Sequence, residues 1–299
     1  MKKRKKPYIG FIAPAFFLYT LFMIIPIFIA MYYSFFQWNG ITDMKFIGLD
    51  NYKTILLGSK LSKTFYNALF NNFKYLACVL LIITPIQIFF AYIIYIKIPA
   101  HKYLRFMLFL PYIISTSIIG FFSMMIFDPN IGVLNKLFAK LGHREWQSAW
   151  LGDPKRVFTI FIIVIIWACI GSGMMILYAS MQDISSDILD AAVIDGANEA
   201  QKFFRVVLPM IVPGLKTVLT LACIYAMTMF DIPFMLGGQS GGVNNKIDFV
   251  NMVFYRTAFG GTYFGETDLG RGSCVSVITF LIILLLYTIV TRILRKMDY

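Results

Sequence analysis

Charged residues are scarce in this chain. Asp, Glu, Lys and Arg make up 14% of 299 residues, against about 25% in a typical soluble domain. Hydrophobic residues account for 59%, and the mean hydropathy is +0.73. One globular core of this length cannot hide so much apolar surface from water. The composition therefore excludes an ordinary soluble globule and predicts an all-α membrane protein.

Residues that build catalytic and metal sites are also few. The 2 histidines, His101 and His143, lie in separate connections with no Cys or carboxylate at ligand spacing. No nucleophile pairs with a base, and no two carboxylates pair, inside an apolar run. We therefore expect neither a metal site nor enzyme activity. The 4 cysteines stand singly within apolar stretches and offer no disulfide framework: Cys78, Cys169, Cys223 and Cys274.

A nucleotide-binding motif is missing too. A P-loop requires GxxxxGK[ST] after a strand, and the nearest fragment, at 214–217, lacks the second glycine and opens an apolar run. We therefore expect this chain to bind no ATP, Mg or other cofactor.

Long apolar runs are abundant. A membrane-spanning helix needs about 20 apolar residues, and six runs qualify. The first follows a basic segment, but it is too long for a signal peptide and no small-x-small cleavage site follows it. We predict one transmembrane domain over residues 1–299 with spans near 9–36, 69–96, 104–127, 157–181, 210–236 and 275–293.

The formal net charge of +12 comes from basic clusters that flank these runs. The clusters are Lys2 to Lys6, Lys97 to Arg105, and Arg292 to Lys296. Their position is typical of membrane topology rather than of a nucleic-acid surface, so no nucleic-acid partner is expected. The positive-inside rule places the clusters and both termini in the cytoplasm. The connections 37–68, 128–156 and 237–274 then face outside.

One connection assigned to the cytoplasm is acidic instead. Residues 183–207 include five carboxylates and only two basic residues. Ser185 or Ser186 can cap a helix that runs to Ile194, Gly196 can end it, and a second short helix starts near Asn198. A helix lying on lipid is the alternative, but such helices favour Lys and Arg on their polar face. A protein partner is the better interpretation.

These residues resemble a known sequence signature. The run Asp190-Ala191-Ala192, Asp195-Gly196-Ala197, Leu208-Pro209 is similar to the cytoplasmic EAA motif of permease subunits of binding-protein-dependent ABC importers. FIGLDNY at 46–52, RFMLFLPYIIS at 105–115, WLGDP at 150–154, FD at 230–231 and YRTAF at 255–259 look like the carbohydrate-uptake branch, of the maltose and multiple-sugar type. The resemblance covers nearly the whole chain.

The resemblance implies a type I ABC importer permease fold, with six transmembrane helices and a cytoplasmic EAA coupling helix, in a bacterial cell membrane. It implies import of a sugar or oligosaccharide and three kinds of protein partner. These are a homologous second permease, an extracellular solute-binding protein, and an ABC ATPase dimer at 183–207 that uses the ATP and Mg. Two departures stand out: Asp190 replaces the family's Glu, and the family's usual GGP loop reads LGGQSGGVNN at 236–245.

The resemblance and the chemistry together name the coupling residues. The side chains of Ala191 and Ala192 are small, so the helix surface there fits into a groove of a partner protein. The alternative is that the alanines only favour helix formation, because alanine has the highest helix propensity. Asp190 and Asp195 can pair with basic groups of the partner, and Gly196 permits a sharp turn. The full predicted set is Asp190, Ala191, Ala192, Asp195, Gly196, Ala197, Leu208 and Pro209.

The predicted substrate path combines aromatic rings and hydroxyls at mid-membrane depth. Tyr112, Ser115 and Thr116 fall on one face of the third span, which we expect to be one helix. Such groups suit a sugar, although Ser and Thr also join helices in membranes. Asp231 is a functional candidate or an interfacial cap. Depth and the resemblance add the rest of the path: Trp167, Cys169, Ala222, Tyr225, Ala226 and Met229.

Other functions need features that this sequence lacks. A phosphorylated polyol or peptide cargo is the nearest alternative, and it is disfavoured because no Lys or Arg lies in mid-span to hold an anion. A free-standing secondary transporter would need intramembrane charge relays or an internal repeat of spans. Neither is visible.

Overall fold

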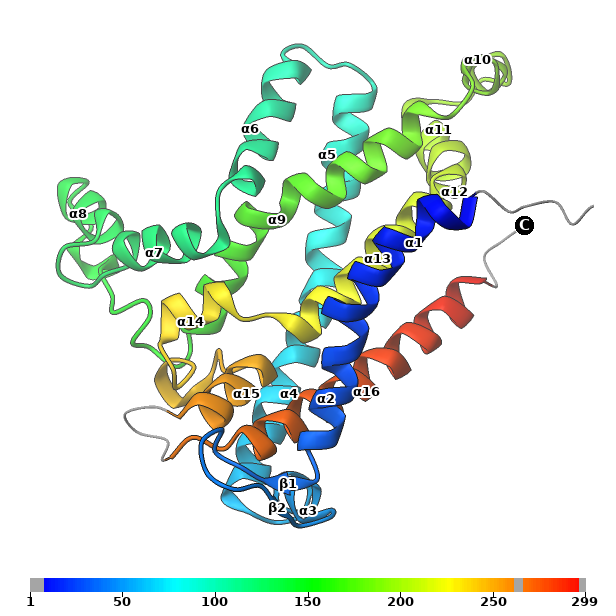
Figure 1. The fold of residues 1–299 in the computed structure, drawn as a ribbon. Coiled ribbons are helices and arrows are strands. Elements are labelled where there is room, and N and C mark those ends of the chain that lie inside the picture. Colours follow the sequence, from blue (N-terminus) through cyan, green and yellow to red (C-terminus); the bar gives the residue numbers. More distant parts are fainter. Residues whose placement is uncertain (1–7, 261–265, 296–299) are drawn as a thin grey trace, which may run out of the picture. The chain divides into compact units, whose positions relative to one another are not determined.

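The computed structural model describes residues 8–260 and 266–295, and helices dominate it (Figure 1). The N-terminal basic cluster and Lys296 lie outside the described residues. Contacts divide the chain into two compact units. Unit 1 comprises Met1–Phe65 and Val253–Leu281, and unit 2 comprises Tyr66–Met252 and Ile282–Tyr299. Each is described by itself, and the expected single domain stays a prediction.

The regular elements follow in chain order. They are α1 (Tyr8–Tyr19), η1 (Thr20–Ile24), α2 (Ile25–Tyr33), β1 (Phe36–Gln37), β2 (Lys45–Phe46), α3 (Asp50–Leu56), α4 (Lys60–Cys78), η2 (Val79–Ile83), α5 (Thr84–Tyr95), α6 (His101–Ile113), α7 (Thr116–Ile126), α8 (Val133–Lys140), η3 (Arg144–Trp146), α9 (Val157–Gln182), α10 (Ser186–Ile194), α11 (Glu199–Lys202), η4 (Phe203–Val207), α12 (Leu208–Met210), α13 (Val212–Thr228), α14 (Asp231–Gly237), η5 (Val243–Asn245), α15 (Val250–Phe259) and α16 (Leu269–Arg295).

Four helical segments in the described residues are long and apolar enough to cross a membrane without a break. The first and fourth of the expected spans appear among them close to their predicted limits. The second begins at Lys60 rather than near residue 69, and the last begins at Leu269 rather than near residue 275. Hydropathy misses these starts because their first turns are polar. The four segments are Phe11–Tyr33, Lys60–Tyr95, Val157–Gln182 and Leu269–Arg295.

The other two expected spans are interrupted. Helices α6 and α7 meet at 99°, so residues 104–127 do not form the continuous helix that we expected. Ile114 and Ser115 are extended there, with ψ of 140° and 135°. Ser115 is the N-cap of α7 through its backbone carbonyl, which accepts from the Ile119 N–H at 3.0 Å, and its side chain makes no capping hydrogen bond. The single face expected for Tyr112, Ser115 and Thr116 was therefore wrong.

The span expected at 210–236 is also divided. Its first residue, Met210, belongs to the segment Glu199–Met210, which bends by 68° into α13. Pro213 stands in the first turn of α13, where its missing N–H does no harm. At the other end α13 stops at Thr228, and α14 starts as a separate helix at Asp231.

Unit 1 contains the first span and a small hairpin. Strands β1 and β2 pair antiparallel, with Phe36 opposite Phe46. The Asn51 amide nitrogen donates to the carbonyls of Ser34 and Phe36, at 3.0 and 2.9 Å. The Tyr52 hydroxyl lies 2.7 Å from the Ser34 hydroxyl. The FIGLDNY segment therefore fastens the hairpin to the end of α2.

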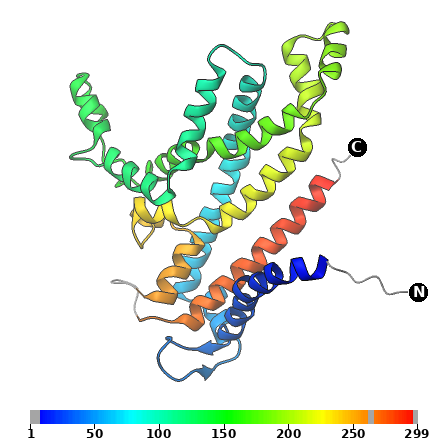
Figure 2. The same cartoon turned by 45° about the horizontal axis from the view of Figure 1, so that its top comes forward.

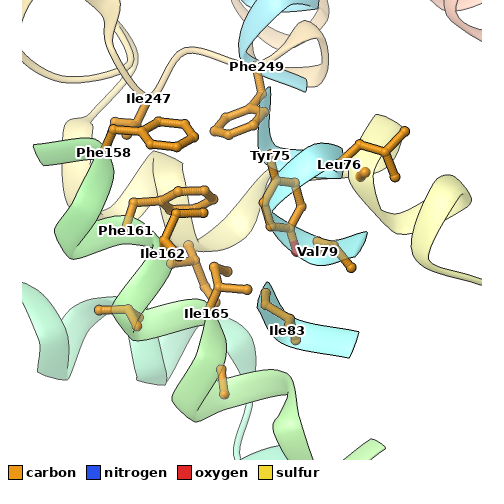
Figure 3. Close-up of a cluster of buried hydrophobic side chains, with 14 of the residues drawn as sticks. Tyr75, Leu76, Val79, Ile83, Phe158, Phe161, Ile162, Ile165, Ile247 and Phe249 are labelled. Atoms are coloured by element: carbon orange, nitrogen blue, oxygen red, sulfur yellow. The ribbon is translucent and has the colours of Figure 1, made fainter. Parts of the chain in front are cut away.

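Unit 2 has an apolar core built around α9. Figure 3 shows aromatic rings from α4, α9 and the segment before α15 that meet there. The Phe161 ring lies 5.5 Å from that of Tyr75 and 5.2 Å from that of Phe249. Helices α5, α6 and α13 also contact α9. This arrangement places the inner faces of several helices around one hollow.

Candidate functional site

A cavity of about 550 Å³ lies within unit 2. Residues from α4, α5, α6, α7, α9, α13 and α14 line it. The lining is mostly apolar, with a few polar groups set into it. A cavity of this size and character is typical of a site for a small organic molecule.

Seven predicted path residues line this cavity, although they come from five separate helices and, for Met229, from the link between α13 and α14. Two of them carry large aromatic rings: Tyr112 of α6 is 51% exposed and Tyr225 of α13 is 60% exposed. Both rings are therefore available to a ligand within the chain as described. The seven are Tyr112, Thr116, Cys169, Ala222, Tyr225, Met229 and Asp231.

Three predicted path residues do not line the cavity. Trp167 is 47% exposed on another face of α9, about 100° around the helix from Ala168, which does line it. Ala226 is fully buried, and its carbonyl accepts a hydrogen bond of 2.6 Å from the Asn72 amide. Ser115 stands in the extended link between α6 and α7. Tertiary packing turns all three away from the hollow.

The two interrupted spans meet at the cavity. The Thr116 hydroxyl, in the first residue of α7, donates a 2.6 Å hydrogen bond to Asp231 Oδ2, in the first residue of α14. The helices then run side by side (Figure 2). They approach so closely that a Cβ on Gly120 would lie 2.6 Å from the Cβ of Met235. Both breaks thus expose a polar group at one point of the lining.

Backbone carbonyls released where α13 ends are satisfied by asparagines. The Asn72 amide donates to the Ala226 carbonyl, and the Asn251 amide donates to the Thr228 carbonyl at 2.8 Å. The Asn72 side chain also accepts from the Val250 N–H at 3.0 Å. Irregular backbone is tolerated at membrane depth only when its polar groups find such partners. These amides therefore stabilise the interruption between α13 and α14.

Sequence reasoning missed several polar residues of the lining, among them Gln87, Ser172 and Thr228. Gln87 of α5 is buried, and its amide nitrogen donates to the Cys169 carbonyl at 2.9 Å. A Cβ on Gly173 would lie 2.2 Å from Gln87 Oε1, so only glycine leaves room for this amide. An amide inside an apolar run was the available signal, and hydropathy counting passed over it.

The acidic connection folds as the helix-turn-helix that the sequence predicts. Ser185 caps α10, and its hydroxyl accepts from the Asp187 N–H at 3.3 Å. Beyond Asp195 the chain turns through Gly196, whose φ is +78°. The Gly196 N–H donates to the Val193 carbonyl and the Ala197 N–H to the Ala192 carbonyl. These two bonds form a Schellman motif, which ends the helix.

The second short helix is capped just as firmly. Asn198 and Gln201 exchange side-chain to backbone hydrogen bonds, each of 2.9 Å, and form a capping box. Tyr92 of α5 donates to Glu199 Oε2 at 3.2 Å and packs against Phe203. The turn is therefore fixed locally and attached to α5.

The predicted coupling residues differ in their exposure. Asp190, Ala191, Asp195 and Gly196 are exposed, whereas Ala192 is buried. Ala197 and Leu208 are partly buried, and Pro209 is exposed in the first turn of α12. Ile194, at 86% exposure, adds an unpartnered apolar group beside the carboxylates. Acidic groups around exposed apolar ones are typical of a protein-docking surface. No cluster of three potential metal ligands occurs in the described ranges.

Residues 55–299 match the family described as binding-protein-dependent transport system inner membrane component. The chain belongs to this family. It is a permease component of an ABC importer, whose ATPase is a separate subunit.

Named relatives extend the match over most of the chain. "Probable starch degradation products transport system permease protein AmyD" of Thermoanaerobacterium thermosulfurigenes is 30% identical, over 96% of this chain and 94% of that protein. "Multiple sugar-binding transport system permease protein MsmF" of Streptococcus mutans is 26% identical, over 94% of this chain and 92% of that protein.

A solved structure shares the architecture. It is a chain of a bacterial ABC transporter involved in the import of the acidic polysaccharide alginate. The TM-score is 0.80 at 19% identity, and the match covers 97% of this chain and 95% of that one. The expected type I permease fold is confirmed at this level.

Proposed function

We propose that this permease moves a sugar or oligosaccharide through the unit 2 cavity. The observation that carries the proposal is the pairing of two exposed tyrosine rings, Tyr112 and Tyr225, with hydrogen-bonding groups in one lining. Sugar rings offer C–H faces that stack on aromatic rings, and their hydroxyls need polar partners. The names of the relatives, which specify starch degradation products and multiple sugars, support a carbohydrate cargo.

The chain is expected to form one half of the path. The segment Phe11–Tyr33 contains no buried residue, so its apolar faces remain free for lipid or for another subunit. The cavity also opens to one side, with Tyr225 60% exposed. A homologous second permease that covers this side would complete the enclosure. An extracellular solute-binding protein would deliver the sugar.

Coupling to ATP hydrolysis is assigned to the connection at 183–207. Its exposed carboxylates and Ile194 suit a groove of an ABC ATPase dimer with basic margins. ATP and Mg would be used by that dimer, and this chain would bind no cofactor. The turn through Gly196 is attached to α5 through Tyr92, which gives a direct route from the ATPase to the spans.

We place the protein in the bacterial cell membrane with both termini in the cytoplasm. The basic clusters at Lys97 to Arg105 and Arg292 to Lys296 support this orientation. A single cysteine at Asn244, in a cysteine-free background, should react with an impermeant thiol reagent only from outside. Reaction from the cytoplasmic side alone would reverse the orientation.

Uptake by the reconstituted importer tests the cargo. The permease pair, the ATPase dimer and the cognate binding protein are placed in proteoliposomes with ATP inside. The vesicles are then offered a panel of radiolabelled neutral and acidic sugars, polyol phosphates and peptides. We expect ATP-dependent accumulation of at least one sugar. Accumulation of a peptide or polyol phosphate with no sugar would overturn the carbohydrate assignment and leave the family assignment intact.

A further inference from the structure

The cavity contains a single formal charge. Among the described residues that line it, Asp231 is the one formally charged side chain, and the rest are apolar or neutral polar groups. No basic side chain of this lining therefore offsets the charge of the carboxylate. A charge in a cleft with low-dielectric walls produces a stronger local potential than the same charge in open water.

Asp231 also keeps hydrogen-bonding capacity toward the cavity. Its Oδ2 accepts from the Thr116 hydroxyl at 2.6 Å, and no cation pairs with it in the part of the chain that is described. The side chain is exposed, which leaves Oδ1 to accept from a ligand. A carboxylate accepts hydrogen bonds from sugar hydroxyls and repels another anion at the same place.

We infer that Asp231 makes the cavity selective by charge: it favours uncharged sugars and rejects anionic ones such as uronates and sugar phosphates. The inference rests on the proposed carbohydrate transport and narrows its substrate class. Hydroxyl donors gain an ionised acceptor, whereas an anion meets a like charge. Thr116 acts as a positioning residue because its bond fixes Oδ2 and leaves Oδ1 to accept from the ligand. Specificity of this kind combines attraction for one cargo with repulsion of its competitor.

Charged thiol reagents measure the field in the cavity without any cargo. Thr228 is the reporter position, because it is exposed, lines the cavity and precedes Asp231 by three residues. Thr228→Cys is made in a chain whose four native cysteines are alanine, and the assembled importer is labelled in nanodiscs during ATP turnover. Two methanethiosulfonates are compared, one carrying trimethylammonium and the other sulfonate. The ratio of their rates reports the local potential, including any contribution from the second permease.

The expected result is a cation-to-anion rate ratio higher at Thr228→Cys than at Ala149→Cys, an exposed loop control outside the cavity lining. Asp231→Asn should lower the ratio at Thr228→Cys by about fivefold. It should leave the ratio at Ala149→Cys unchanged. Tyr225→Cys provides a second reporter in the same lining.

A ratio at Thr228→Cys that does not respond to Asp231→Asn would overturn the inference and make Asp231 a structural link to α7. A ratio no higher than at the loop control would overturn it as well, because the complete cavity would then carry no net negative potential. Failure of both reporters to react would do the same, since a cavity closed to aqueous ions cannot select by charge. The labelling needs no sugar, so a peptide found in the uptake assay would refute the carbohydrate function and leave this result standing.

Discussion

The hydroxyl of Thr116 donates a 2.6 Å hydrogen bond to Asp231, across 115 residues of sequence. Each residue opens a helix that follows an interruption in an apolar span. The bond therefore joins two breaks and places the cavity's carboxylate where both end. Because α7 and α14 continue in close contact, their packing and the position of Asp231 depend on each other.

Gly120→Ala tests the packing of α7 on α14. The added Cβ would lie 2.6 Å from the Cβ of Met235, too close to be accommodated without a shift. Overpacking of this kind costs about 1–3 kcal/mol, and we expect the apparent melting temperature of the purified complex to fall by roughly 2–10 °C. Gly152→Ala is the matched control, since its Cβ would meet only Ala149, whose Cβ lies at 3.4 Å and whose carbonyl oxygen lies at 3.6 Å. Equal melting of the two variants would show that the contact is loose.

Gly196→Val tests the turn of the coupling connection. At a φ of +78° a β-branched side chain strains the backbone, although nothing lies within 4 Å of the added Cβ. We expect sugar uptake to be lost while the subunit remains in the membrane. Gly142→Val is the control, because Gly142 has a φ of +86° and equally open surroundings but lies outside the 183–207 connection. Uptake and membrane abundance are measured together, and similar uptake by both variants would place the joint elsewhere.

Asp190→Lys tests the charge of the docking surface. Asp190 is exposed on α10, so the substitution reverses a charge without disturbing a packed core. We expect attachment of the ATPase to weaken by at least about tenfold, measured by co-purification with the tagged permease. Asp43→Lys makes the same reversal on the exposed hairpin of unit 1 and should leave attachment unchanged. Normal co-purification of both variants would contradict an acidic docking surface.

Tyr112→Ala tests stacking in the cavity. Loss of the half-exposed ring should reduce sugar uptake by roughly three- to tenfold, while ATPase attachment persists. Tyr112→Phe keeps the ring and should cost less. Tyr103→Ala removes a tyrosine of the same helix that is 77% exposed and absent from the cavity lining, and it should have little effect. Uptake rates are compared at equal membrane abundance. Equal losses in the Ala and Phe variants of Tyr112 would favour a structural hydroxyl over stacking.

The features that the sequence predicts correctly are those set by composition or by a few neighbouring residues. The apolar composition requires lipid, and long apolar runs become helices because backbone groups in lipid must bond within the segment. The helix-turn-helix at 183–207 was equally predictable from sequence, since Ser185, Gly196 and Asn198 each act on the backbone within one helical turn. These signals are local, so they need no knowledge of the fold.

Tertiary structure decided where two spans break and which helix faces reach the cavity. Hydropathy indicates one apolar run at 104–127, but in the structure the chain bends at Ser115. The next residue, Thr116, hydrogen-bonds to Asp231, which lies 115 residues further along the chain. The same packing turns Trp167 and Ala226 away from the hollow and brings Gln87 into its wall. The periodicity of the sequence shows which residues share one face of a helix. Which of these faces lines the cavity depends on the other helices that pack against it. That choice is a property of long-range contacts, which no single segment encodes.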